Sequence, residues 1–120
     1  MKAALSVLAL VLSPLAHADE TSKFVCQQTH LEAGQSRHTM VLKEIGAAPI
    51  KEGVEAKCQF LLFNDTDRAP EIATVVSVTT EDVMFNFESK KHGISGIIFL
   101  DEYDQTSATI NGVDMRFTCK

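Results

Sequence analysis

The Asn111-Gly112 dipeptide is the feature that most constrains how this chain of 120 residues folds. Asn-Gly tolerates the positive φ that a two-residue type I′ hairpin turn requires at both of its central positions. With the turn placed there, the apolar residues of the two arms share one face, and the alternation turns Cys119 inward. The segment therefore predicts a half-buried antiparallel hairpin. The predicted cross-strand pairs are Ile110 with Val113, Ala108 with Met115, Thr106 with Phe117, and Asp104 with Cys119.

The same period of two recurs upstream. In residues 54–62 apolar side chains alternate with charged or polar ones, which predicts a strand with Cys58 on its buried side. Gly96 indicates a bulge or bend in a later strand. Eight short strands with regularly spaced turn signals predict an all-β domain, either a small antiparallel barrel or a sandwich. The other predicted strands cover 24–31, 38–45, 72–79, 83–88 and 94–100.

The first eighteen residues have the pattern of a secretory signal peptide. Lys2 precedes an apolar run over residues 3–12, Pro14 follows, and a small-x-small ending comes directly before Asp19. The run is shorter than the roughly 20 apolar residues of a membrane span. We therefore expect a signal peptide over 1–18, a single β domain over 19–120, and a periplasmic or secreted protein.

Composition argues against several classes of partner. The formal net charge is −5, and removal of a leader whose only charged residue is Lys2 makes it −6. The basic residues are scattered, with Lys90-Lys91 as the only pair, and the chain has no Trp and one Tyr. Nucleic acids and anionic membranes bind basic stripes, and bases also stack on aromatic side chains, so neither is an expected partner.

Three cysteines in an exported chain allow one disulfide and leave one free thiol. Cys26 lies in the first predicted strand and Cys119 in the last, so a closed barrel would bring them together. Pairing of Cys58 with either of the others remains an alternative, because the connectivity depends on topology. With Cys26 bonded to Cys119, Cys58 would be a buried free thiol on an apolar face, a setting that does not favour reactivity.

Motifs for catalysis and for metal binding are both lacking. The chain has no GxSxG elbow and no HExxH, and we predict no catalytic residue and no enzyme activity. His30 and His38 flank a predicted hairpin loop without an evident third ligand, and neither acidic loop has the spacing of an EF-hand. We therefore predict no cofactor and no resident metal. The acidic residues considered as calcium ligands are Asp65, Asp67, Asp101 and Asp104.

Both ends of the chain resemble one known family. The "FVC" that ends at Cys26 and the "FTC" that ends at Cys119 resemble small periplasmic β-barrel inhibitors of lysozyme, which also tie a first-strand cysteine to one near the C-terminus. The resemblance covers only these two ends. In those inhibitors a Ser-Gly loop is followed by an aromatic-rich strand, whereas Ser95-Gly96 leads only to "IIFL". No functional residue is carried over.

These observations leave two functional hypotheses. The first is a protein-binding or inhibitory module for an exported partner, with Leu61 and Phe63 as candidate patch residues because they have the outward parity of their strand. The second is a small barrel that binds an apolar molecule among inward-facing phenylalanines. A hollow interior would favour the second hypothesis and a filled one the first. The phenylalanines concerned are Phe60, Phe85, Phe87, Phe99 and Phe117.

Overall fold

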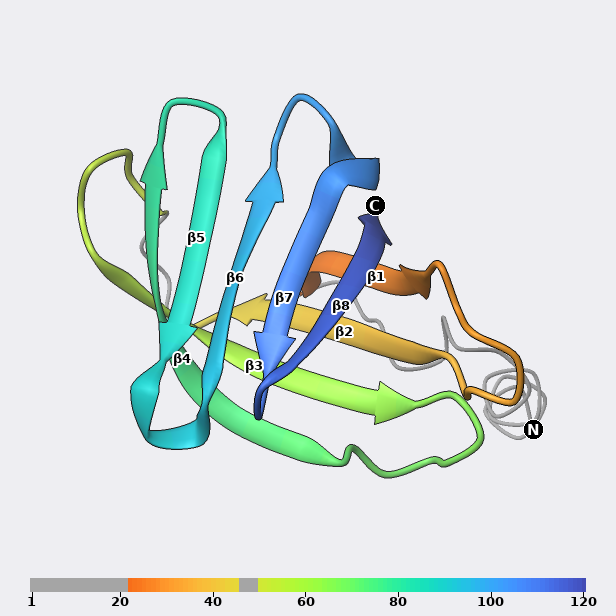
Figure 1. Ribbon diagram of the computed structural model, residues 1–120. Coiled ribbons are helices and arrows are strands. Elements are labelled where there is room, and N and C mark those ends of the chain that lie inside the picture. Colours follow the sequence, from red (N-terminus) through yellow and green to blue (C-terminus); the bar gives the residue numbers. More distant parts are fainter. Residues whose placement is uncertain (1–21, 46–49) are drawn as a thin grey trace, which may run out of the picture.

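Eight antiparallel strands close into a barrel in the computed structural model, which describes residues 22–45 and 50–120. Each strand pairs with the next in sequence, and the last pairs with the first (Figure 1). The predicted all-β fold is confirmed, as the barrel rather than the sandwich. The predicted signal peptide lies outside the described residues. The strands are β1 (Ser22–Thr29), β2 (His38–Glu44), β3 (Ala56–Asn64), β4 (Ile72–Glu81), β5 (Met84–Ser89), β6 (Ile94–Phe99), β7 (Thr106–Ile110) and β8 (Val113–Cys119).

The β7–β8 hairpin has the predicted register. Asn111 and Gly112 form its turn with φ values of 52° and 81°, and three of the four predicted pairs are present. The pairing of Asp104 with Cys119 is wrong, because β7 begins at Thr106 and Asp104 lies in a short 3-10 helix (Tyr103–Gln105) before it. One side chain departs from the expectation, because Val113 is 51 % exposed. It follows the turn directly and lies beyond the part of β8 that pairs with β1, so a neighbouring strand flanks it on the β7 side alone.

Apolar side chains fill the barrel interior. The four phenylalanines of its centre are no more than 2 % exposed, and Phe60 and Phe87 lie with ring centroids 5.9 Å apart. Phe24 packs edge-to-face on Phe85 at 4.9 Å. Because burial of apolar area is the main driving force for folding, this interior is what holds the sheet closed. The buried phenylalanines of the centre are Phe60, Phe85, Phe87 and Phe117. The expectation that Phe99 also faces inward is wrong: Ile98 is the buried residue at this point of β6, and alternation places the half-buried Phe99 on the outer side.

Gly96 lies in an unbroken register, and so the predicted bulge is absent from β6. A Cβ atom on Gly96 would lie 2.2 Å from Cζ of Phe87, the residue paired with it on β5. Glycine is therefore required here because an aromatic ring occupies the space of its side chain. The register shift that the sheet does contain lies in β1, between Ser22 and Phe24.

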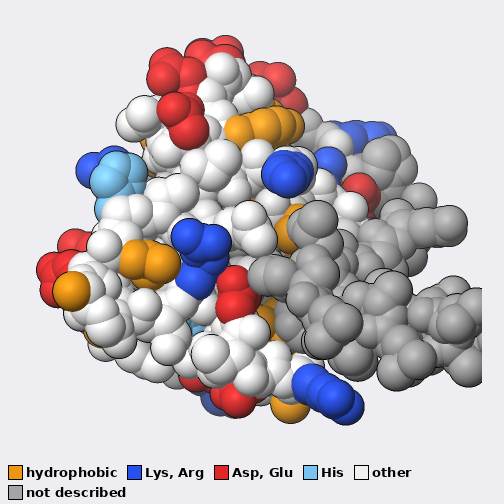
Figure 2. All heavy atoms as spheres, turned by 90° about the vertical axis from the view of Figure 1, so that its right-hand side faces the viewer, with side chains coloured by type: hydrophobic (Ala, Val, Ile, Leu, Met, Phe, Trp, Pro, Cys, Tyr) orange, Lys and Arg blue, Asp and Glu red, His pale blue; other side chains and the backbone are white. Residues whose placement is uncertain are grey.

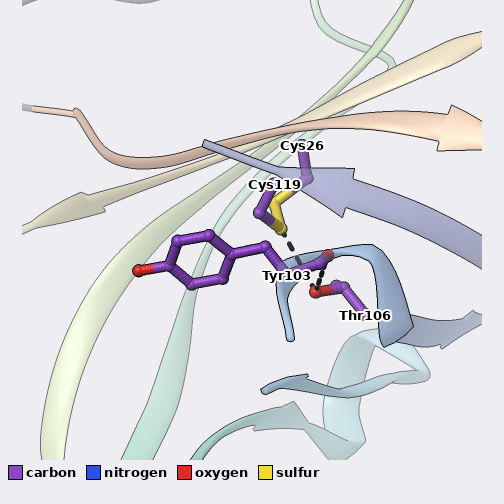
Figure 3. The surroundings of a disulfide bond; sticks show 4 residues. All are labelled: Cys26, Tyr103, Thr106 and Cys119. Atoms are coloured by element: carbon purple, nitrogen blue, oxygen red, sulfur yellow. Dashed lines mark hydrogen bonds between the residues drawn. A yellow bond between two sulfur atoms is a disulfide. The ribbon is translucent and has the colours of Figure 1, made fainter. Parts of the chain in front are cut away.

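A disulfide between Cys26 and Cys119 joins β1 to β8, across a separation of 93 residues (Figure 3). The two cysteines are also register partners, so barrel closure alone brings them together. The predicted pairing is confirmed, and the alternatives through Cys58 are wrong. The Thr106 hydroxyl lies 3.4 Å from the Cys119 sulfur and donates a hydrogen bond to the Tyr103 carbonyl at 2.9 Å.

Cys58 is buried in the barrel interior and forms no disulfide. Burial first, and the negative charge of Glu44 second, raise the pKa of its thiol to about 11, against the opposing effect of Lys23. The thiol is therefore protonated at neutral pH, and it packs as a small apolar side chain.

In the part of the chain that the structure describes, no helix is both long enough and apolar enough to cross a membrane.

Candidate functional site: a polar groove across four strands

A groove of about 590 Å³ lies on the outer face of the barrel, across β4, β5, β6 and β7. Most of its lining side chains carry a hydroxyl, an amide or a carboxylate, and no Lys, Arg or His is among the lining residues that the structure describes. Its lining residues are Glu55, Ser77, Thr79, Asn86, Phe87, Glu88, Ser95, Gly96, Ile97, Ser107, Ala108 and Thr109.

Strand register explains why polar side chains line both walls of this groove. Residues of neighbouring strands that pair with each other point to the same side of the sheet, and successive residues of one strand alternate between sides. Two outward rows, separated by one inward row, therefore run across the four strands. The first row is Ser77, Glu88, Ser95 and Thr109, and the second is Thr79, Asn86, Ile97 and Ser107.

The floor of the groove belongs to the inward row between these walls. Phe87, Gly96 and Ala108 are paired in sequence across β5, β6 and β7. Phe87 is only 2 % exposed because its ring points into the barrel. Because this row directs its side chains into the barrel, its backbone faces outward and forms the floor of the groove.

The hydrogen bonds within and beside the groove leave its carboxylates available. Lys57 Nζ donates to Ser77 Oγ at 3.5 Å at one corner, and Thr109 Oγ1 donates to Asp114 Oδ1 at 2.6 Å at the opposite corner. Glu55 and Glu88 are exposed, and neither forms an ion pair within residues 22–45 and 50–120. The groove is thus rich in hydrogen-bond acceptors and carries two negative charges.

Leu61 and Phe63 lie on the outer face of β3, in the opposite half of the barrel from the groove. With Val41 they form a cluster separate from the interior core, and Val25 packs against it. Both side chains are buried, with exposed fractions of 9 % and 5 %. Their role in binding a partner remains a prediction.

The structure separates the residues considered as metal ligands. Asp65 and Asp67 lie in the β3–β4 loop, where Asp65 accepts a hydrogen bond from Thr39 at 2.6 Å. Asp101 and Asp104 lie in the β6–β7 connection, at the opposite end of the barrel. The described segments bring together no group of three or more His, Cys, Asp or Glu side chains suited to a metal ion.

The two candidate histidines have separate hydrogen-bond partners. His30 Nδ1 lies 2.9 Å from the Thr29 hydroxyl. His38 Nε2 lies 3.0 Å from Glu71 Oε1, and its Nδ1 lies 3.3 Å from Gln28 Oε1. These contacts tie the start of β2 to β1 and to the start of β4, and so His38 has a structural role at this end of the barrel.

One end of the barrel is strongly acidic, and it adjoins the groove. The β4–β5 turn and the β6–β7 connection lie there side by side, joined by a hydrogen bond from Leu100 N to Val83 O at 2.7 Å. Figure 2 shows Asp and Glu side chains gathered at the upper end of the molecule, where Figure 1 places these two segments. The exposed carboxylates of the two segments are Glu81, Asp82, Asp101, Glu102 and Asp104.

Comparison with protein-family models, with curated proteins and with solved structures finds no match to this chain. The resemblance to lysozyme inhibitors accordingly rests on the two cysteine-containing ends alone. Inferences about function therefore depend on the fold and on the surfaces described above.

The groove was missed from the sequence because it depends on which strands pair and in what register. Two signals were present in the sequence. Outward-facing hydroxyls recur in "SVTT" and "TSAT", and a lone glycine interrupts "ISGII". Neither signal indicates a groove until β4, β5, β6 and β7 lie side by side.

Proposed function

We propose that the mature domain is an exported, non-enzymatic module that binds another exported protein, as a partner or an inhibitor, through the groove across β4 to β7. The observation that carries the proposal is the location of this groove, on the outer face of a barrel whose interior is filled by its own side chains. A surface concavity with many hydrogen-bonding groups suits a protruding segment of a protein partner.

Export is supported by the leader pattern of residues 1–18 and by the disulfide, which persists in oxidising compartments. The disulfide also makes a rigid scaffold, and a rigid surface loses less entropy when it binds.

The alternative function, a carrier of an apolar small molecule, has less support. It requires space among the inward-facing phenylalanines, and the four that do face inward pack within the centre at no more than 2 % exposure. The groove itself is polar, and apolar ligands favour apolar pockets.

The proposal can be tested by a pull-down from the exported fraction of the source cells with three oxidised proteins: wild type, Ser95→Trp and Thr118→Trp. Ser95 lies in the groove wall, whereas Thr118 faces outward on β8 and is outside the groove. We expect wild type and Thr118→Trp to retain one protein in stoichiometric amount and Ser95→Trp to lose it. Retention by all three, or retention of a small molecule alone, would contradict the proposal.

A further inference from the structure

We propose that the groove accepts a basic side chain, lysine or arginine, of the protein partner, with Glu88 as its central contact. This inference rests on the proposed function and adds to it the chemistry of the partner. The argument uses the hydrogen-bonding character of the groove, its charge and the acidic end that adjoins it.

Glu88 is flanked by a hydroxyl on each side. Its register partners are Ser77 on β4 and Ser95 on β6, and paired residues of antiparallel strands have Cβ atoms about 5 Å apart. Carboxylate and hydroxyl oxygens all accept hydrogen bonds, whereas arginine and lysine side chains only donate them. A guanidinium held by the Glu88 carboxylate would therefore have further acceptors within reach on both neighbouring strands.

The charge of the groove favours a cation over an anion. Glu55 and Glu88 line it, and two basic residues lie at its margins: Lys57 is engaged with Ser77 at one corner, and Arg116 on β8 pairs with Ser107 of the wall. A phosphate or a carboxylate ligand would meet two negative charges and no cationic side chain of the lining. A desolvated charge needs an opposite one, and so a basic group is the complementary occupant.

The acidic end extends this negative surface beyond the groove. Glu81 lies two residues after Thr79 along β4, which corresponds to about 7 Å at the usual rise of a strand. That separation is shorter than the Debye length of about 8 Å at physiological ionic strength, so the acidic end contributes to the potential over the groove. The opposite end of the same strands carries Lys90, Lys91 and His92, so the surface charge changes from negative at one end to positive at the other. A basic segment would therefore approach over the acidic end.

A direct test uses the tripeptide N-acetyl-Gly-Arg-Gly-amide and its citrulline analogue, which has the same shape without the charge. Each is titrated into the oxidised mature protein and followed by NMR of the backbone amides. We expect the arginine peptide to shift the amide resonances of Glu88, Ser95 and Ile97, and the citrulline peptide to bind at least fivefold more weakly.

Two variants that each remove one negative charge distinguish direct contact with the peptide from long-range electrostatic attraction. Glu88→Gln lies in the groove, whereas Glu102→Gln lies at the acidic end. We expect Glu88→Gln to weaken binding of the arginine peptide at least fivefold and Glu102→Gln less than twofold. Equal effects of the two variants, equal binding of the two peptides, or shifts confined to residues outside the groove would overturn the inference.

The outcome is distinguishable from failure of the proposed function. If Ser95→Trp abolishes capture of a protein partner while Glu88→Gln leaves that capture unchanged, the groove binds a protein by other chemistry. The proposed function then stands and the cation inference falls. A neutral ligand such as a carbohydrate would give that same insensitivity to Glu88→Gln, with a small molecule retained in place of a protein, and would contradict both.

Discussion

The outer faces of the two halves of the barrel differ in polarity, although the same alternation of strand residues produces both. In β1 to β3 the outer face carries a buried apolar cluster of Val41, Leu61 and Phe63. In β4 to β7 it carries hydroxyls, carboxylates and the groove. The difference is visible in the sequence, since "FLLF" in β3 is continuously apolar whereas "MFNFES" in β5 alternates. A continuous apolar run is typical of a strand buried on both faces.

The pairing of β1 with β8 closes the barrel, and the disulfide spans this seam. Replacing both Cys26 and Cys119 with alanine should cost about 4 kcal/mol of unfolding free energy, because the unfolded chain regains the entropy of an open 93-residue loop. Urea denaturation of the variant and of the wild type measures the difference. A loss below about 1 kcal/mol would mean that strand pairing alone holds the seam.

Aspartate placed on each outer face tests the contrast between the halves directly. Val41→Asp should destabilise by about 3 kcal/mol, since it places a charge at a position with no exposed surface. Ile97→Asp, in the groove wall, should cost about 1 kcal/mol, mainly through lower strand propensity. Chemical denaturation of both variants gives the comparison. Equal losses would show that solvent reaches the outer face of β2.

Gly96→Ala tests the packing beneath the groove floor. The added methyl group would overlap the Phe87 ring, and the variant should lose about 2 kcal/mol of stability. Phe87→Leu should be less harmful in the Gly96→Ala background than in the wild type, because the smaller side chain makes room for the methyl group. A double-mutant cycle from thermal or urea denaturation measures this coupling. Additive losses would contradict the proposed contact.

The smallest effect concerns Cys58, which lies on the inner face of the apolar half. Its folded-state pKa of about 11 is higher than the ordinary value of 9.0, so folding favours the protonated thiol. The stability that this thiol contributes is present below pH 9 and is lost as pH rises towards 11. Urea midpoints of wild type and Cys58→Ala at pH 8 and pH 10.5 isolate the contribution. A wild type that loses no more stability than Cys58→Ala would contradict it.

Much of the fold was predictable because its determinants are local. Asn111-Gly112 specified one hairpin and its register. Alternation predicted the bounds of most other strands to within two or three residues of the observed ones. The exception at Gly96 has a long-range cause. A glycine in a strand indicates either a bulge or a close neighbour, and only the position of Phe87 decides between them.

The sequence by itself determined which residues are strand-forming, which side of each strand is apolar, and that Cys119 faces inward, because these properties depend on residues close together in the chain. Tertiary structure alone decided that the sheet closes, that Cys26 rather than Cys58 meets Cys119, and that polar side chains of four strands line one groove. The physical reason is that pairing between strands distant in sequence depends on how the whole sheet buries its apolar face.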